Sequence, residues 1–405
     1  MIADVTVVMP ARNAGATIGR AIRSVGGRRV REMVVVDHAS SDDTAAAAVA
    51  AAADVPIRVI PVAATLRLGG VRQVGLDNVR TPYAVWLDAD DELLEGRVDR
   101  FAAHLDAGAD ITADAAELQD LDGSRRPLPM PGFLQVTGGI VRLFERSYLP
   151  APGVVGCRVE AVRRVGYDPV QHGPEDTDLL LRAIVAGLRF TLEPTPGYRI
   201  YASPGSISRQ RANQRAMYRA LLLKHPHDVV REVYLAAGWS DRVAHWAIHS
   251  MALFTDDLAG ARRILDGLDG LSDGVTDDDV IERDGPIRHR EGWRMAFARG
   301  TLALLDDQAD DARPWLERAE LHEPTAEGAN NLGVALARAG RIDDARRAFG
   351  LAVERRPAYV DARDNLAAEF PQHVTTHPFR AQDVRLDYSA QPHQGPGHPI
   401  ASFVS

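Results

Sequence analysis

The amino-acid sequence predicts an α/β domain with a mostly parallel sheet, followed by an all-helical domain. Over about the first 90 residues, short apolar runs rich in β-branched residues alternate with helical patterns. This order of elements builds a parallel sheet that helices cover on both faces. After residue 208, long helical patterns replace the strand signals, and a short motif recurs at a fixed spacing.

Four apolar runs predict the strands of the sheet: residues 5–9, 33–36, 57–60 and 83–87. Between them, apolar residues at helical spacing predict helices from Ile18 to Val25, from Thr44 to Ala53 and from Gly69 onward. Farther along, residues 111–118 are expected to form a strand and the proline-containing segment 127–132 a loop. Ligands of such sheets bind beyond the carboxyl ends of the strands. The loop after the first strand, Asp37 and Asp88 are therefore expected at one edge.

An acidic motif follows the fourth apolar run and contains Asp88, Asp90, Asp91 and Glu92. Alternation along a strand would put Asp88 and Asp90 on one face, about 6 to 7 Å apart. Two such carboxylates suit a hard divalent cation that also binds phosphate oxygens. Aspartates also open turns, because their side chains bond to nearby backbone amides. A solvated turn is therefore the alternative interpretation.

Composition excludes several classes of protein. The chain has 405 residues, of which 45% are hydrophobic and 25% charged, so two or three soluble domains are expected. A net charge of -9, without a basic stripe interleaved with aromatic residues, gives no support to nucleic-acid binding. The single cysteine, Cys157, excludes an internal disulfide and is typical of a reducing compartment. A lone cysteine beside valines and glycine is more typical of a small buried residue than of a nucleophile.

Targeting signals are not evident in the sequence. The first strand pattern begins within a few residues of the N-terminus, without the basic and apolar regions of a signal peptide. The alanine-rich run from Thr44 to Ala53 is too short to span a bilayer. The sequence therefore predicts a cytoplasmic location and no membrane span.

The first half of the chain resembles glycosyltransferase family 2, the inverting nucleotide-sugar enzymes of the Rossmann-like GT-A fold. The resemblance depends on four segments in order: Val7–Asn13, Val34–Thr44, Gly70–Leu76 and the Asp-x-Asp motif Leu87–Asp91. One departure is Gln73, where the family commonly has asparagine. The resemblance implies a nucleotide-sugar donor bound at the carboxyl edge of the sheet.

The resemblance also implies roles for individual residues at this edge. Asp37 would accept a hydrogen bond from the base or the ribose of the nucleotide. Asp88 would contact the ribose or an outer-shell water, and Asp90 would bind Mg²⁺ or Mn²⁺ bridging the diphosphate. Arg72 is a candidate for a diphosphate contact, although an arginine at a helix start is as often solvated. The remaining donor-binding candidates are Pro10, Ala11, Arg12, Asn13 and Ala89.

A second acidic motif, Glu175-Asp176, opens a predicted helix that ends near Gly187. Acidic residues suit the positive end of a helix dipole, which is a sufficient structural reason for both. Family members place a Glu-Asp pair before such a helix and use the aspartate as the base. The resemblance therefore implies that Asp176 is the catalytic base. Glu175 would either orient the acceptor or have no role in the reaction. Many relatives carry a histidine at the position of Tyr201, so the third protein ligand of the metal is in doubt.

The helical half contains an internal repeat. The motif Asp310–Arg313 recurs as Asp343–Arg346, about 33 residues later, close to the tetratricopeptide period of roughly 34. Gly333, Ala345 and Ala352 would let paired helices approach. The predicted domains are a GT-A domain over residues 1–208, a helical connector over 209–290, tetratricopeptide-like repeats over 291–370 and a flexible tail over 371–405. The repeats are expected either to bind a peptide or protein, or to self-associate as in a homodimer.

These observations predict a metal-dependent inverting glycosyltransferase that uses a nucleoside diphosphate sugar, first of all a UDP-sugar. The layout also resembles bacterial S-glycosyltransferases of peptide bacteriocins, which implies a peptide acceptor. A cell-envelope or exopolysaccharide glycan and a small natural product are the other acceptor hypotheses. An inactive scaffold that binds partners through its repeats is the alternative outside enzymes.

Overall fold

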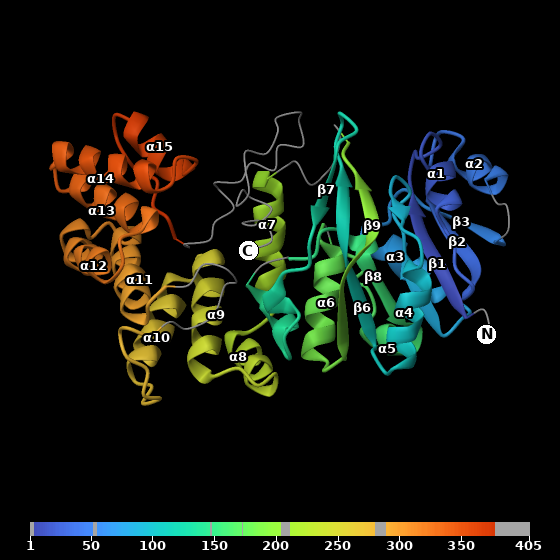
Figure 1. Cartoon of the computed structure of the whole chain (residues 1–405), viewed down its shortest axis with the longest axis horizontal. Helices are drawn as coiled ribbons and strands as arrows, with labels where there is room; N and C mark the ends of the chain where they lie inside the picture. Colours follow the sequence, from blue (N-terminus) through green and yellow to red (C-terminus); the bar gives the residue numbers. More distant parts are fainter. Residues whose placement is uncertain are drawn as a thin grey trace. The chain divides into compact units, whose positions relative to one another are not determined.

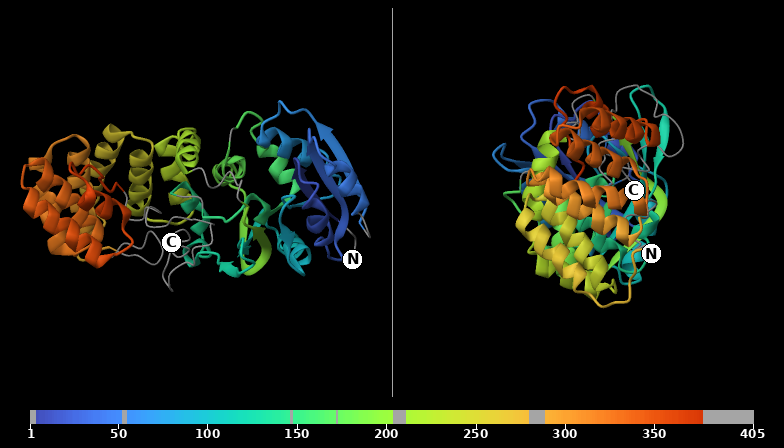
Figure 2. Two further views of the ribbon diagram at one scale, coloured as in Figure 1. Left: turned by 90° about the horizontal axis from the view of Figure 1, so that it is seen from above. Right: turned by 90° about the vertical axis from the view of Figure 1, so that its left-hand side faces the viewer.

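The computed structural model describes residues 4–51, 55–145, 148–171, 173–203, 211–279 and 289–376, with the backbone alone for 211–215. The described chain divides into two compact units, one up to Val233 and one from Tyr234. The domain boundaries expected at residues 208, 290 and 370 remain predictions. The α/β architecture followed by helices is as the sequence predicts (Figures 1 and 2).

The first half of the sheet is parallel, with strand order β3-β2-β1-β4. Its strands are β1 (Val5–Ala11), β2 (Val30–His38), β3 (Ile57–Val62) and β4 (Tyr83–Trp86). The central valines of β1, β2 and β4 are buried, because helices cover both faces, whereas those of the edge strand β3 are half-buried. The intervening helices are α1 (Ile18–Arg23), α2 (Thr44–Ala50) and α3 (Leu68–Asp77).

Strand order decides on which face each helix lies. The chain moves outward from β1 to β3 and then crosses back to β4 on the far side of β1. Parallel crossovers are right-handed, so α3 lies on the opposite face of the sheet from α1 and α2. The carboxyl ends meet at one edge, where Ala11 pairs with Asp37 and Val8 pairs with Trp86. The predicted positions of Asp37, Asp88 and the Pro10–Asn13 loop at this edge are confirmed.

The second half of the sheet is mixed, so the expectation of a mostly parallel sheet holds only for the first half. Strand β8 (Val155–Arg158) joins β4 and β6 (Ile111–Gln119) antiparallel, and β9 (Phe190–Tyr201) then pairs parallel with β6. Antiparallel pairs also attach β5 (Glu92–Leu93) to β9 and β7 (Arg125–Leu128) to β6. The loop predicted to start at residue 127 is therefore partly wrong. Proline is tolerated in β7 because edge strands leave amides unpaired.

Three more helices complete the α/β unit near the sheet: α4 (Arg97–Asp106), α5 (Val159–Val165) and α6 (Glu175–Val185). Short 3₁₀ turns cover residues 132–134, 139–144 and 152–154. Helices α7 (Arg211–Leu222) and α8 (His227–Ala236) follow β9. Cys157 is buried in β8, and burial raises the pKa of its thiol to about 12. The prediction that Cys157 is a small buried residue is confirmed.

A fully buried ion pair lies beneath β4, the strand that precedes the acidic motif. Arg97 donates from Nε to Asp114 Oδ2 at 2.8 Å, and from its other nitrogens to the carbonyls of Trp86 and Gly153. Both charged side chains are 0% exposed, so each depends on the other for solvation. Gly197 makes room for the pair, because a Cβ there would lie 1.9 Å from Asp114 Oδ2.

Replacing Gly197 with alanine should therefore destabilise the α/β unit by about 1–3 kcal/mol through overpacking. The free energy of unfolding, measured by urea denaturation, checks this expectation. Gly26→Ala is the matched control, because nothing lies within 4 Å of a Cβ at Gly26. The control should change stability by no more than about 0.5 kcal/mol. If both substitutions lowered the free energy of unfolding equally, the Arg97–Asp114 pair would be able to move away from the added Cβ, and the expectation would be wrong.

The second unit consists of antiparallel helical hairpins. Its helices are α9 (Asp241–Phe254), α10 (Leu258–Asp269), α11 (Glu291–Leu305), α12 (Ala309–His322), α13 (Ala326–Arg338), α14 (Ile342–Arg355) and α15 (Val360–Ala367). A Cβ at Gly300 would lie 2.6 Å from Leu316 Cγ, and one at Gly333 would lie 2.5 Å from Phe349 Cε1. The predicted close approach at Gly333 is confirmed, whereas membership of the tetratricopeptide family stays a prediction.

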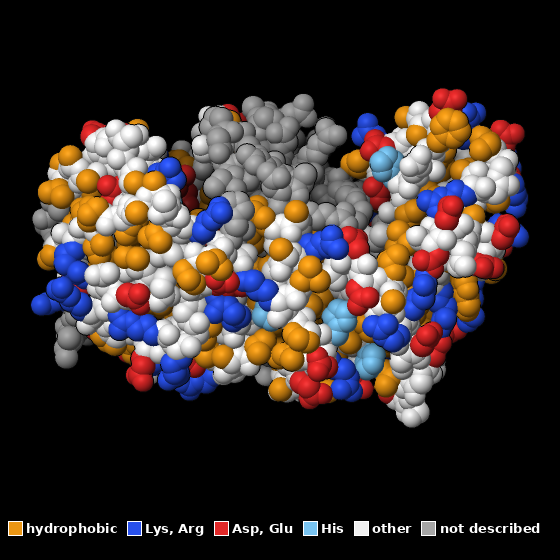
Figure 3. Space-filling model, turned by 180° about the vertical axis from the view of Figure 1, so that it is seen from behind, with side chains coloured by type: hydrophobic (Ala, Val, Ile, Leu, Met, Phe, Trp, Pro, Cys, Tyr) orange, Lys and Arg blue, Asp and Glu red, His pale blue; other side chains and the backbone are white. Residues whose placement is uncertain are grey.

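Charged side chains of both signs are interspersed on the face shown in Figure 3. Among the described residues, no helix combines the length and the apolar character that crossing a membrane requires.

Candidate functional site

Two loops at the carboxyl edge of the sheet are bound to each other. The amide of Asn13 donates to Ser40 Oγ at 3.0 Å, and the amide of Ser41 donates to Asn13 Oδ1 at 2.8 Å. The amide of Ala14 donates to the buried hydroxyl of Thr44 at 2.7 Å. Asn13 itself has a φ of +50°, a conformation that asparagine tolerates better than most residues. The loop after β1 is therefore held by the start of α2.

The other donor-binding candidates of this edge differ in exposure. Pro10 is half-buried and Ala11 buried, whereas Arg12 is exposed. Asp37 is half-buried at the end of β2, and its Oδ1 accepts the amide of Ser40 at 3.2 Å. This bond fixes the carboxylate of Asp37 at the edge, where a ligand can reach it.

The acidic motif is a turn and not a continuation of the strand. Strand β4 ends at Trp86, and the amide of Asp91 donates to the carbonyl of Asp88 at 3.2 Å. The expectation that strand alternation places Asp88 and Asp90 on one face is therefore wrong. Ala89 is buried inside this turn, and Asp90 lies exposed at its outer side. The turn brings the carboxylates together by folding the backbone back within four residues.

Crowding of negative charge perturbs these carboxyl groups. Desolvation by the surrounding protein raises the pKa of Asp90 although the residue is exposed, and the Asp88 carboxylate raises it further. Burial, followed by the charges of Asp88 and Asp90, raises the pKa of Asp91 well above its usual range. A cation placed here would relieve both effects, because an opposite charge favours the ionised carboxylate.

Arg72 joins the two acidic motifs. Its Nη2 donates to Asp88 Oδ1 at 2.9 Å and its Nε donates to Glu175 Oε1 at 2.7 Å. The guanidinium is 2% exposed and lies 5.4 Å from the ring of Trp86. Although burial disfavours its charge, Asp88 and Glu175 hold the pKa of Arg72 above its ordinary value. Arg72 is therefore a buried bridge and not a solvated residue, and its Nη1 has no hydrogen-bond partner among the described residues.

Glu175 and Asp176 open α6 next to this bridge. Glu175 is buried, with its carboxylate on Arg72, whereas Asp176 is half-buried. Burial, and then the neighbouring Glu175 carboxylate, raise the pKa of Asp176 to about 7, against the lowering effect of Arg72. A carboxyl group with this pKa can take up and release a proton near neutral pH, as acid-base catalysis requires.

Two residues that support α6 were not assigned a role by the sequence. Lys224, the only lysine of the chain, donates to Asp168 Oδ2 at 2.8 Å and to Asp178 Oδ1 at 2.7 Å. Gln73 accepts the amide of Tyr167 at 2.6 Å, so the departure from asparagine keeps a structural bond to the loop before α6. The uniqueness of Lys224 was visible in the sequence, but its partners are distant along the chain.

Tyr201 stands where the family resemblance of the sequence leads one to expect a histidine. Its amide donates to Asp91 Oδ1 at 2.9 Å, and the guanidinium of Arg20 lies 3.6 Å from the centre of its ring. Arg20 also donates to the carbonyl of Asp90. Tyr201 therefore ties the end of β9 to the acidic turn through its backbone, while its ring packs against an arginine.

The donor set of the turn fits a hard divalent cation whose coordination is completed by a ligand. Among the described residues, no group of three or more histidine, cysteine, aspartate or glutamate side chains is arranged to hold a metal. Asp90 and the second oxygen of Asp88 would supply two carboxylates, and Mg²⁺ takes its remaining ligands from phosphate oxygens and water.

Comparison with known proteins agrees with this geometry. Residues 6–165 match the family model described as glycosyl transferase family 2. The match thus marks a domain similar to this family within less than half of the chain. The matched region contains β1 to β4, Arg72 and the acidic turn, but it ends before the Glu175-Asp176 motif.

Relatives of the glycosyltransferase domain occur in two settings. The succinoglycan biosynthesis protein ExoO of Rhizobium meliloti (strain 1021) is 33% identical over 232 residues, which cover 51% of this chain and 63% of that protein. The pre-mycofactocin glycosyltransferase of Mycobacterium tuberculosis is 30% identical over 199 residues, which cover 47% of this chain and 41% of that protein. The chain thus spans less than two thirds of the length of either relative.

Solved structures resemble the chain more loosely. The S. aureus TarS fragment 1-349 in complex with UDP-GlcNAc is 16% identical with a TM-score of 0.49, and the alignment covers 88% of this chain and 93% of that one. The glucosyl-3-phosphoglycerate synthase of Mycobacterium tuberculosis, solved with Mn²⁺, UDP and phosphoglyceric acid, is 18% identical with a TM-score of 0.40 over 58% of this chain and 79% of that one. Because the identities are under 25% and the TM-scores under 0.5, the ligands of those structures are not assigned to this chain.

Removing Arg72 should destabilise the domain, because Glu175 would be left buried and unpaired. For Arg72→Met we expect a loss of about 3–5 kcal/mol in the free energy of unfolding, measured by urea denaturation. The double variant Arg72→Met, Glu175→Gln should recover part of this loss, since no buried charge is then left alone. The matched control is Arg164→Met, whose guanidinium is 66% exposed and should matter little. A double variant no more stable than Arg72→Met would contradict the bridge.

Proposed function

We propose that the chain is an inverting glycosyltransferase that moves a sugar from a nucleoside diphosphate donor to an acceptor hydroxyl. The observation that carries this proposal is the Arg72 bridge, which holds the Asp88–Asp91 turn and the Glu175-Asp176 motif together although Glu175 lies 103 residues beyond Arg72 in the sequence. A nucleotide site and a candidate base are thereby joined by one buried side chain. The family 2 match of residues 6–165 supports the same activity.

The donor would lie at the carboxyl edge of the sheet. Asp37 would accept a hydrogen bond from the base or ribose, and the loop Pro10–Asn13 would line the nucleotide, with Asp88 and Ala89 below the ribose. The unpartnered Nη1 of Arg72 is a donor available to a diphosphate oxygen. A UDP-sugar is the first donor to test, because the resemblance of the sequence points to it.

Asp90, with Asp88, would hold Mg²⁺ or Mn²⁺ against the diphosphate. Such an ion neutralises the negative charge that develops on the departing phosphate. The residues present fit this role, since Asp90 and Asp91 both have raised pKa values that a cation would lower.

Asp176 would act as the base. It takes the proton of the acceptor hydroxyl while the acceptor oxygen bonds to the anomeric carbon from the side opposite the leaving group. The bond between the anomeric carbon and the phosphate oxygen breaks, the nucleoside diphosphate leaves, and the configuration inverts. Glu175 cannot take this proton as readily, because its carboxylate is held by Arg72. Glu175 therefore positions Asp176, and orients the acceptor only through it.

A hydroxyl suits this site better than a thiol as the acceptor. An alcohol is a weak nucleophile until its proton is removed, whereas a thiol with a pKa near 8.5 needs less help. The two relatives are named for succinoglycan biosynthesis and for pre-mycofactocin, and these names support a glycan and a non-glycan acceptor respectively. A hydroxyl-bearing peptide or glycan is the acceptor class that we would test first. An inactive scaffold would have no need of a half-buried base with a raised pKa.

Asp90→Asn should abolish metal-dependent nucleotide binding. With UDP and Mn²⁺ at about 100 times the dissociation constant, the parent chain should gain roughly 2.7 kcal/mol, seen as a thermal shift, and the variant should gain little. The matched control Glu95→Gln removes an exposed carboxylate nearby and should keep the full shift. An undiminished, metal-dependent shift in Asp90→Asn would show that the metal is held elsewhere.

Asp176→Asn should lower kcat by about 10² to 10⁴ while leaving the nucleotide-dependent thermal shift intact. In the parent chain, the rate should rise with pH and level off above about 7, because Asp176, whose pKa is about 7, must be ionised to accept a proton. Transfer rates measured between pH 5.5 and 9 with a sugar-nucleotide donor check both expectations, and product NMR checks inversion. A flat profile, or an active Asn variant, would assign the base elsewhere.

A further inference from the structure

The last described residues of the chain, 371–376, follow α15 as a segment without regular secondary structure. The sequence assigns them to a flexible tail, but they lie against α11 and α13, the first helices of two successive hairpins, and against α15. These helices contribute Thr301 from α11, Asn330 and Asn331 from α13, and Asn365 from α15. We refer to these four polar residues as the amide face.

The amide face holds the segment by its backbone. Asn331 accepts the amide of Thr375 at 2.8 Å and donates to the carbonyl of the same residue at 2.8 Å. Asn365 accepts the amide of His373 at 2.8 Å and donates to its carbonyl at 2.9 Å. Asn330 donates to that same carbonyl at 2.9 Å. Any residue other than proline offers these groups, so the contacts would suit extended peptides of different sequence.

Side chains of the segment divide into bound and exposed ones. Val374 packs against the hydrophobic core of the helices, and Thr375 is 1% exposed. The Thr375 hydroxyl donates to Asp361 Oδ2 at 2.8 Å and also contacts the hydroxyl of Tyr359. The side chains of Gln372 and His373, in contrast, are exposed. The face therefore accommodates one pair of small β-branched side chains and leaves the preceding two positions unselected.

The segment covers the asparagines of the amide face. Asn330 and Asn331 are 0% exposed and Asn365 is 1% exposed. Their mutual contacts, such as Asn365 Nδ2 to Asn330 Oδ1 at 2.9 Å and Asn331 Nδ2 to Thr301 Oγ1 at 3.0 Å, use only part of their hydrogen-bonding capacity. The segment therefore both shields these amide groups from water and supplies the hydrogen-bond partners that water would otherwise provide.

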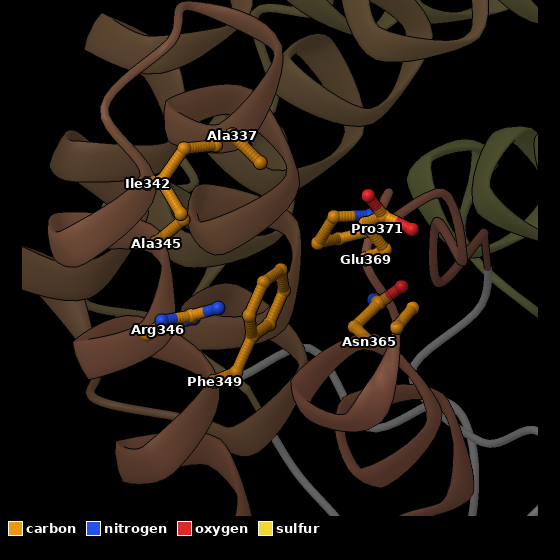
Figure 4. A pocket seen from close by; sticks show the side chains of 9 residues that line it. Ala337, Ile342, Ala345, Arg346, Phe349, Asn365, Glu369 and Pro371 are labelled. Carbon is orange, nitrogen blue, oxygen red and sulfur yellow. The ribbon is translucent and has the colours of Figure 1, made fainter.

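The entry of the segment onto the helices is loosely packed. Figure 4 shows a pocket between Phe349 and Ile342 on one side and Glu369 and Pro371 on the other. Phe370, between the latter two, is 73% exposed. The segment is thus attached firmly at 373–375 and weakly where it leaves α15.

We propose that the amide face is a binding site for an extended peptide, and that residues 371–376 occupy it as a ligand within the same chain. An external peptide with a β-branched pair takes the place of this segment when the segment leaves. The segment then acts as an internal competitor that limits access to the helical unit. This proposal does not depend on the glycosyltransferase activity.

The test compares the full chain with a chain that ends at Phe370, using the labelled peptide Phe-Pro-Gln-His-Val-Thr-Thr as the probe in fluorescence anisotropy. The shortened chain should bind the peptide at least about ten-fold more tightly than the full chain does, because the site is empty. Asn331→Ala in the shortened chain should weaken binding about ten-fold or more, since both contacts to the backbone of one peptide residue are lost. A shortened chain with unchanged helical circular dichroism that binds no peptide would overturn the proposal.

Two matched peptides separate backbone recognition from side-chain recognition. Methylation of the nitrogen that corresponds to Thr375 removes the proton donated to Asn331 and should abolish binding. Alanine at the positions of Gln372 and His373 should leave the affinity unchanged, because those side chains are exposed. The reverse pattern would show that the segment is recognised by its side chains and would contradict the proposal.

If the shortened chain does not fold, hydrogen exchange of the full chain tests the proposal instead. A displaceable segment opens locally, so the amide of Thr375 should exchange much faster than the interior amides of α13. Exchange as slow as that of α13 would make residues 371–376 a permanent part of the fold, and the proposal would be wrong.

Discussion

The buried guanidinium of Arg72 is the interaction on which the candidate site depends. A charge at 2% exposure is unfavourable unless carboxylates surround it, and here Asp88 and Glu175 come from motifs far apart in the sequence. Each carboxylate needs the arginine as much as the arginine needs them. The acidic turn and the start of α6 are therefore fixed relative to each other by a requirement of charge burial, and not by a direct contact between the two motifs.

Other charged side chains around the Arg72 bridge are also neutralised by partners of opposite charge. Arg97 and Asp114 are fully buried under β4, and Lys224 joins the loop before α6 to α6 itself. These pairs leave Asp90 exposed and Asp176 half-buried, so the two residues proposed to do chemistry are those not committed to an internal ion pair. Rigid neighbours and a free carboxylate are what a pre-organised site requires.

The helical unit uses neutral polar groups in place of charges. Its hairpins pack through small residues such as Gly300 and Gly333, which leave a continuous apolar core between paired helices. Asparagines on the first helices then line one face and pair with a peptide backbone. Amides can pair with any extended chain, whereas ion pairs select their partners. The first unit therefore depends on buried ion pairs, whereas the second depends on neutral amide groups that bond to a peptide backbone.

The sequence by itself determined the strands β1 to β4 and β6, the carboxyl edge that bears Asp37 and Asp88, and the burial of Cys157, because these follow from local hydrophobic pattern and strand direction. It also indicated the close helix pairs at Gly333. Only the tertiary structure decided that Asp88–Asp91 is a turn, that the second half of the sheet is mixed, and that residues 371–376 are bound. It alone showed that Arg72 lies between two carboxylates and that Lys224 bonds to Asp178 of α6. Those features depend on partners dozens of residues away, and a local pattern cannot specify which distant side chain will neutralise a buried charge or amide.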